Sequence, residues 1–177
     1  MLEILLIGIA LSMDAFAVTL SSSMVYPNMT LRQKLSLPIA FGLFQGVMPT
    51  LGYYLGSLFS SFIEAYSGII SCVILAIIGI NMIKEGISPD EQTEKVFSLK
   101  ILLLQAVATS IDAFAVGVSF AAMGAHILSS AAIIAASTFI LTMFALKIGN
   151  FAGKKLGDKS VIIGGIILII IGIKALL

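Results

Sequence analysis

Six long runs of mostly apolar residues, separated by short polar stretches, restrict this chain to a membrane. A helix needs about 20 such residues to cross the hydrocarbon, where nothing in the lipid pairs with backbone N–H and C=O groups. Only 11% of the 177 residues are charged, whereas soluble domains have about a quarter. The sequence therefore predicts an all-α, polytopic membrane protein with six transmembrane helices. The runs lie at 2–24, 36–59, 66–86, 99–123, 127–151 and 159–177.

Lysine and arginine concentrate in alternate connectors between these runs. The second and fourth connectors have none. Basic connectors remain on the cytoplasmic side, so we expect a multi-pass protein of the cytoplasmic membrane, with the lipid bilayer around it and both termini outside. The net charge of +1 and the absence of a dense basic cluster indicate no nucleic-acid partner. The basic residues of the other connectors and their flanks are Arg32, Lys34, Lys84, Lys95, Lys100, Lys147, Lys154, Lys155 and Lys159.

A repeated motif divides the chain into two halves. SMDAFAV occupies residues 12–18 and SIDAFAV residues 110–116, while IIGINMI at 77–83 corresponds to IIGIKAL at 170–176. Because each half holds three spans, the second half must enter the membrane from the opposite side. This predicts two inverted three-helix repeats, an architecture typical of secondary transporters with a midplane site. The predicted division is residues 1–86, a cytoplasmic linker at 87–98, and residues 99–177.

Each copy of the motif places an aspartate near the centre of a predicted span. Asp14 and Asp112 would each cost about 2.5–3.5 kcal/mol at the centre of a membrane helix, so their carboxylates need compensation. Small residues share their helical faces, which allows close approach of other helices and an inward orientation. A cation or proton site is the functional interpretation; two protonated aspartates bonding across helices is the structural one.

Other oxygen-bearing side chains lie at a similar depth or next to the aspartates. Carboxylate, amide and hydroxyl oxygens suit Mg, Ca or Mn better than Cu(I) or Zn. Interhelical hydrogen bonding is an equally good role for a midplane amide. The predicted metal ligands are Asp14, Asp112, Gln45, Thr138, Ser12 and Ser110.

The paired DAFAV motifs, with FGLFQGVMPTLGYYLG in the second run and GGIILIIIGIKAL at the end, resemble the bacterial manganese efflux pump family over essentially the full length. The resemblance implies two inverted halves of three helices and export of Mn²⁺ across the bacterial cytoplasmic membrane. It also implies transport by the intramembrane aspartates that match Asp14 and Asp112. Gln45 matches a position that is Glu in some members. The chain departs from the pattern at Ala145, where glycine is expected, and at Val161, where an acidic residue is expected.

The sequence shows no GxxxxGK[ST] loop and no soluble domain, so nothing indicates direct drive by ATP. We therefore expect a secondary exporter, not an enzyme, with no cofactor, Mn²⁺ as its transported substrate and a proton as the candidate counter-ion. An exporter of another cation, or of a small solute such as an amino acid, shares this architecture. An intramembrane aspartyl protease is a further alternative, because two aspartates can share a proton and activate water. Neither aspartate lies in a GxGD motif, which disfavours the protease.

Overall fold

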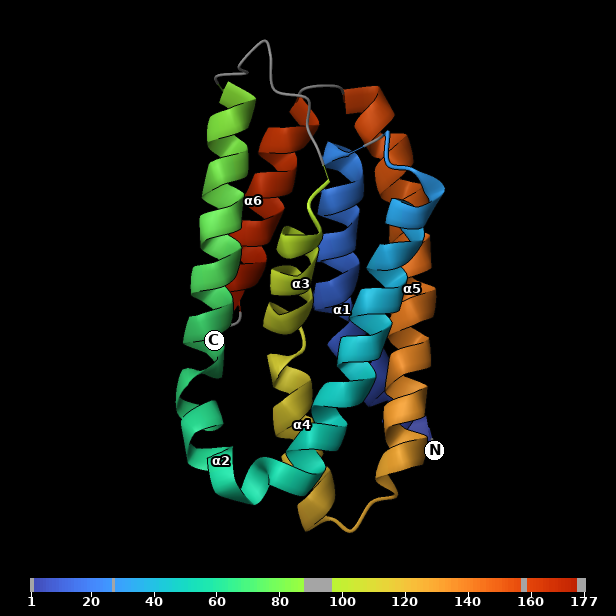
Figure 1. The fold of residues 1–177 in the computed structure, drawn as a ribbon, viewed down its shortest axis with the longest axis vertical. Helices are drawn as coiled ribbons and strands as arrows, with labels where there is room; N and C mark the ends of the chain where they lie inside the picture. The colour runs from blue at the N-terminus through green and yellow to red at the C-terminus, as the bar shows by residue number, and fades with distance from the viewer. Residues whose placement is uncertain (1, 27, 88–96, 157–158, 175–177) are drawn as a thin grey trace.

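All regular secondary structure that we describe is helical, as predicted. The computed structural model describes residues 2–26, 28–87, 97–156 and 159–174. Figure 1 shows the helices aligned along the long axis of one elongated bundle. Most of the predicted linker, residues 88–96, and the last three residues lie outside the described ranges. The helices are α1 (Leu2–Val25), α2 (Leu31–Ile87), α3 (Leu99–Ala108), α4 (Ile111–Ala122), α5 (Ile127–Leu156) and α6 (Lys159–Lys174).

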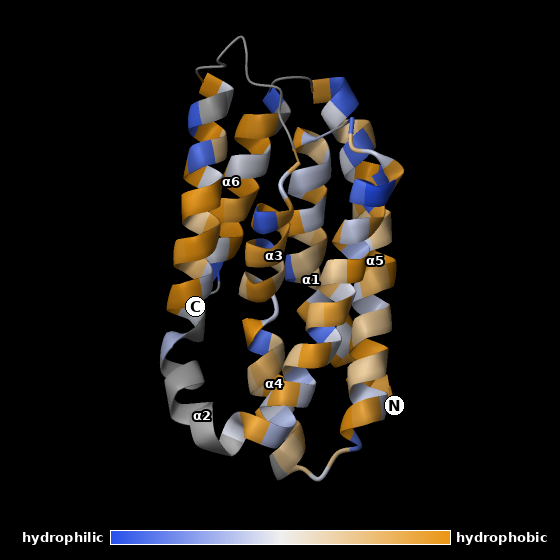
Figure 2. Cartoon of the chain, in the orientation of Figure 1, coloured by the Kyte–Doolittle hydropathy of each residue, from blue (hydrophilic) through white to orange (hydrophobic). Residues whose placement is uncertain are grey.

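The outer surface of the bundle is apolar, as lipid requires. Large side chains such as Leu43, Ile77 and Phe144 are each more than half exposed, and Figure 2 shows apolar residues along most of the length of the helices. In water such a surface would drive aggregation. Four described helical segments are long and apolar enough to cross a membrane, and two shorter apolar helices accompany them. The long segments are Leu2–Val25, Leu31–Gly56, Leu99–Ala121 and Ile127–Leu156; the short ones are Gly68–Lys84 and Val161–Lys174.

The second and third predicted runs form a single helical element, α2, instead of two helices joined by a loop. Residues 57–67 contain neither glycine nor proline, so no residue there is a strong helix breaker. The chain nevertheless turns back at the lower end of α2 (Figure 1). Its first arm packs on α4 and α5 and its second arm on α6 and α3.

The fourth predicted run, 99–123, is interrupted in the middle, which corrects the expectation of one continuous helix. α3 ends at Ala108 and α4 begins at Ile111. The Thr109 hydroxyl donates to Gln105 O at 3.0 Å, and the Ser110 hydroxyl donates to Ala106 O at 2.7 Å. Such side-chain bonds compete with the backbone ladder of a helix. The interruption lies two residues before Asp112.

Each copy of the DAFAV motif packs closely against a helix from the other half of the chain. Gly117 of α4 lies against Pro49 O of α2, and Gly149 of α5 lies against Leu20 O of α1. A side chain at either glycine would collide with backbone, so these positions need a residue without Cβ. The close contacts fix α4 on α2 and α1 on α5, and with them the two aspartates.

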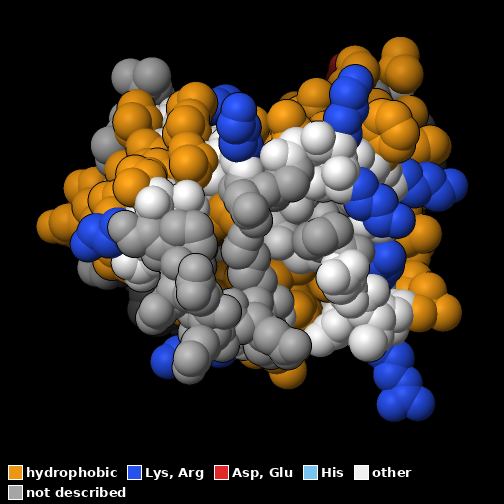
Figure 3. Space-filling view, turned by 90° about the horizontal axis from the view of Figure 1, so that it is seen from above, with side chains coloured by type: hydrophobic (Ala, Val, Ile, Leu, Met, Phe, Trp, Pro, Cys, Tyr) orange, Lys and Arg blue, Asp and Glu red, His pale blue; other side chains and the backbone are white. Residues whose placement is uncertain are grey.

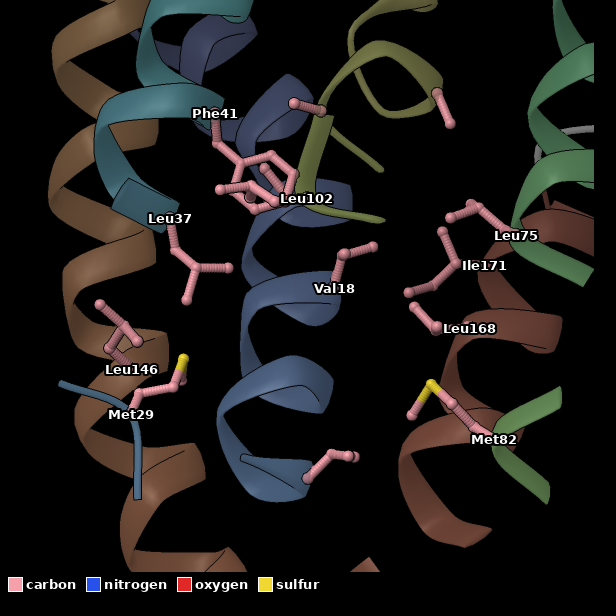
Figure 4. Close-up of a cluster of buried hydrophobic side chains, with 14 of the residues drawn as sticks. Val18, Met29, Leu37, Phe41, Leu75, Met82, Leu102, Leu146, Leu168 and Ile171 are labelled. Carbon is pink, nitrogen blue, oxygen red and sulfur yellow. The ribbon is translucent and has the colours of Figure 1, made fainter. Parts of the chain in front are cut away.

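A sealed apolar core lies between the aspartates and the end of the bundle that carries the basic connectors. Figure 4 shows part of it, where Val18, Leu102 and Leu168 approach from α1, α3 and α6. These three side chains are at most 1% exposed. On α1 the core includes Ala15, next to Asp14, and then Val18 and Val25, with buried Thr19 and Ser21–Ser23 between them. The bundle is therefore closed on the side of the basic connectors.

Candidate functional site

Asp14 and Asp112, from the two copies of the repeated motif, line one cavity of about 220 Å³. A water molecule occupies about 30 Å³ in the liquid, so the cavity has room for a cation with several of its waters. Helix α1, the second arm of α2, the α3–α4 interruption and the end of α6 form its walls. The lining residues are Asp14, Gly68, Ser71, Leu75, Ala108, Thr109, Asp112, Ile171 and Lys174.

The Asp112 carboxylate belongs to the first turn of α4 and is exposed at the cavity. Its Oδ1 accepts a hydrogen bond of 2.8 Å from the Ala113 N–H. The first N–H groups of a helix carry a partial positive charge, which stabilises an anion there. In an unbroken helix the same N–H would donate to Thr109 O. The interruption thus frees a backbone donor for the Asp112 carboxylate at the cavity.

The Asp14 carboxylate lies in the middle of α1 and forms an ion pair with Lys174, in the last turn of α6. Lys174 Nζ donates to Asp14 Oδ1 at 3.0 Å; the Asp14 side chain is 26% exposed and that of Lys174 67%. With both carboxylates ionised, two carboxylates and one ammonium give the cavity one net negative charge. Sequence reasoning missed Lys174 as a cavity residue. The sequence does carry a signal for it. The residue after IIGI is Asn81 in the first half and Lys174 in the second, so a lysine stands where the repeat has an uncharged residue.

Gln45 joins the two copies of the motif directly. Its side chain is fully buried, and its Nε2 donates to Leu11 O at 3.3 Å and to Thr109 O at 2.9 Å. Those carbonyls are at equivalent positions, each three residues before its aspartate. Only the NH₂ group of an amide can donate to two carbonyls, which fixes the orientation of the side chain. Its Oε1 is buried without a hydrogen-bond partner.

The three predicted hydroxyl ligands are fully buried and bonded to protein atoms. The oxygens of Ser12 and Thr138 lie 2.8 Å apart and share a hydrogen bond, and Ser110 donates to a backbone carbonyl within α3. The structure thus brings two of the six predicted ligands, the aspartates, to the cavity wall. Gln45, Ser12, Thr138 and Ser110 are absent from its lining residues. Among the described residues, no group of three or more His, Cys, Asp or Glu could hold a metal.

The backbone carbonyls exposed by the helix interruption already have donors. Ser71 Oγ donates to Ala108 O at 2.8 Å, and the Gln45 amide donates to Thr109 O. Apart from Lys174, the polar side chains that line the cavity are the two aspartates, Ser71 and Thr109, so a cation there would meet oxygen atoms and water. Such all-oxygen surroundings suit a hard divalent ion that retains part of its hydration shell.

Comparison with known proteins assigns the chain to a family. Residues 28–176 match a family described as "Putative manganese efflux pump". The chain belongs to this manganese efflux pump family. Relatives that carry the same name, followed by MntP, include one from Ruminiclostridium cellulolyticum, 45% identical over 97% of this chain and 93% of its own length. Another, from Methanobrevibacter smithii, is 44% identical over 100% of this chain and 97% of its own length.

Membership of the manganese efflux pump family confirms the resemblance inferred from the DAFAV motifs, and places the chain among transporters, not enzymes. No solved structure matches the chain. Both departures from the family pattern are fully buried. Ala145 packs where α5 meets α1, with the Ser23 hydroxyl donating to its carbonyl at 3.5 Å. Val161 lies in the first turn of α6 and belongs to the apolar core.

Proposed function

We propose that this chain exports Mn²⁺ across the cytoplasmic membrane as a secondary transporter, with Asp14 and Asp112 as the metal-binding carboxylates. The observation that carries the proposal is the shared cavity, because two aspartates 98 residues apart in the sequence line it together. The names of the relatives supply the identity of the metal. Oxygen ligands suit Mn²⁺, although they would also accept Mg²⁺ or Ca²⁺.

The architecture that we propose is six membrane-spanning segments in two inverted repeats, residues 1–86 and 99–177, joined by the linker at 87–98. Reciprocal contacts support it. A Cβ at Gly79 would meet Gly165 O, and a Cβ at Gly172 would meet Cys72 O. Gly79 and Gly172 are equivalent in the IIGI alignment, and Cys72 and Gly165 are related by the same sequence offset. A two-fold axis that relates the repeats would convert the contact of Gly79 with Gly165 into the contact of Gly172 with Cys72. Both contacts are present, as expected of two repeats that pack against each other.

The proposed transport cycle uses the cavity alternately from the two sides of the membrane. In the described arrangement the apolar core closes the end with the basic connectors, so the carboxylates would face away from the cytoplasm. Opening of that core would admit Mn²⁺ from the cytoplasm. Both carboxylates can hold a proton in place of a metal ion, which makes a proton the proposed counter-ion.

Expression of the chain in a bacterial strain that lacks its own manganese exporters is expected to lower cellular manganese and to raise manganese tolerance. Elemental analysis of washed cells measures the first effect, and growth in graded MnCl₂ the second. Parallel cultures with Mg²⁺, Ca²⁺ and Zn²⁺ test which cation is exported, and an amino-acid panel tests the solute alternative. Unchanged manganese content in cells whose membranes contain the protein would refute the proposed function.

The proposed orientation places the N-terminal end of α5 outside and its C-terminal end in the cytoplasm. Figure 3 shows lysine and arginine gathered at the end of the bundle seen from above. In a Cys72→Ser background, His126→Cys should react in whole cells with an impermeant thiol reagent and Lys154→Cys should not. Both positions are exposed at opposite ends of α5, and permeabilised cells provide the control for Lys154→Cys. The opposite pattern of labelling would reverse the topology.

A further inference from the structure

We propose that the Lys174 ammonium is a built-in competitor of the transported cation: it occupies Asp14 when the cavity is empty and leaves when a divalent ion binds. The inference rests on the proposed function. It starts from the ion pair itself, in which the ammonium lies 3.0 Å from one of the two candidate metal-binding carboxylates.

Charge is the first argument. With both carboxylates ionised and Lys174 in place, the empty cavity has one net negative charge, and a divalent ion added to it would leave one net positive charge. Like charges close together repel, and a partly enclosed cavity screens that repulsion less than bulk water does. Displacement of the ammonium from Asp14 relieves this repulsion and frees a carboxylate oxygen for the metal. The lysine side chain is 67% exposed and ends a helix, so it has room to move.

Asymmetry between the two halves is the second argument. The repeat that supplies Asp14 and the repeat that supplies Asp112 correspond closely, but the residue equivalent to Lys174 is Asn81. Asp112 accepts a hydrogen bond from the backbone of its own helix, whereas Asp14 accepts one from the long Lys174 side chain across the cavity. Of the two aspartates, only Asp14 forms an ion pair with a lysine or arginine of the described residues. A packing role alone would not require an ammonium within hydrogen-bond distance of that carboxylate.

A structural role provides the alternative explanation. A lysine in the last turn of a helix interacts favourably with the C-terminal carbonyls, so Lys174 could simply stabilise α6. The two roles differ in one measurable respect. An internal competitor weakens metal binding, so its removal should increase affinity, whereas removal of a helix-stabilising residue should lower thermal stability and leave affinity unchanged.

The test measures Mn²⁺ binding to the purified full-length protein, with the free ion quantified by its electron paramagnetic resonance signal. Lys174→Gln is expected to lower the Kd about five-fold, which corresponds to the upper range of about 1 kcal/mol for a solvent-accessible ion pair. Lys174→Arg retains the charge and should bind as wild type does. Lys159→Gln, at the exposed opposite end of α6, makes the same change in net charge away from the cavity and should also leave the Kd unchanged.

A second measurement uses the wild-type chain and so does not depend on the folding of a variant. Reductive methylation followed by mass spectrometry reports how readily each lysine reacts, with Lys159 as the internal reference. Addition of MnCl₂ should increase the reactivity of Lys174 relative to Lys159, because the metal frees the ammonium from Asp14. In Asp14→Asn, Lys174 should be reactive with or without Mn²⁺.

The outcomes separate this inference from the proposed function. If Asp112→Asn loses Mn²⁺ binding while Lys174→Gln binds as wild type and the metal leaves Lys174 reactivity unchanged, the metal site stands and the competitor role is overturned. If Asp112→Asn and Asp14→Asn both bind Mn²⁺ as wild type does, the proposed site is wrong, and the role of Lys174 is refuted with it.

Discussion

Replacement of either cavity aspartate by asparagine is expected to abolish manganese export. Asparagine retains the shape of aspartate but removes its charge, so the cavity with Lys174 in place would have no net negative charge to attract a divalent ion. Efflux of Mn²⁺ from preloaded cells measures the effect of Asp14→Asn and Asp112→Asn. Glu3→Gln removes a carboxylate from the exposed first turn of α1 and is the matched control, expected to export normally.

The double variant distinguishes one shared site from two independent sites. If Asp14 and Asp112 bind the same ion, removal of the second carboxylate adds nothing to the loss caused by the first, because groups that act as a unit are not additive. The amount of each variant in the membrane fraction shows whether it is inserted. A single variant that kept about half the wild-type rate, with the double variant at the product of the two, would contradict a shared site.

Gln45→Met is expected to destabilise the helix interruption and to impair export. Methionine has a similar length and volume but no donor, so Thr109 O loses the amide N–H that it accepts. The Ala113 N–H could then donate to that carbonyl, as in a continuous helix, and would leave Asp112. Interhelical hydrogen bonds in membranes average only about 0.6 kcal/mol, but a buried carbonyl left without a donor costs about 1–3 kcal/mol. The larger cost applies for as long as the interruption persists in the variant, so it favours the continuous helix in which the Ala113 N–H donates to Thr109 O.

Thermal unfolding in detergent and Mn²⁺ efflux together test this prediction. Gln33→Met is the same substitution at a half-buried position, where Gln33 Oε1 accepts a solvent-exposed hydrogen bond from the Thr30 N–H at 2.8 Å. Water can replace that bond, so we expect a much smaller change in unfolding temperature and normal export. Wild-type stability and export in Gln45→Met would show that Gln45 neither holds the interruption nor influences Asp112.

The lengths of the apolar runs predicted most of the helices, and the repeated motif predicted that the two aspartates lie together. The first and fifth predicted runs agree with α1 and α5 to within a few residues. In lipid, a single apolar segment can pair all its backbone N–H and C=O groups internally only by forming a helix. The shared aspartate motif predicted that Asp14 and Asp112 belong to one site, which the common cavity supports.

The interruption before Asp112 could not be predicted from the two motifs alone. The serine of the first copy donates to Gly8 O four residues back within an unbroken helix, while the serine of the second copy lies where the helix stops. The difference lies in the partners that other helices supply. Ser71 and Gln45 donate to the carbonyls of Ala108 and Thr109. These hydrogen bonds replace the backbone bonds that the interrupted helix lacks, and so stabilise the interruption.

By itself the sequence indicated that the chain is helical and apolar, that one motif recurs in its two halves, and that each copy holds an aspartate within an apolar run. These properties depend on local composition and on periodicity along one chain. Only the tertiary structure decided that Gln45 bridges both motifs, that four predicted ligands bond to protein atoms instead of lining the cavity, and that Lys174 reaches Asp14. Those outcomes depend on distances between residues far apart in the sequence, set by where glycines such as Gly117 let two helices touch.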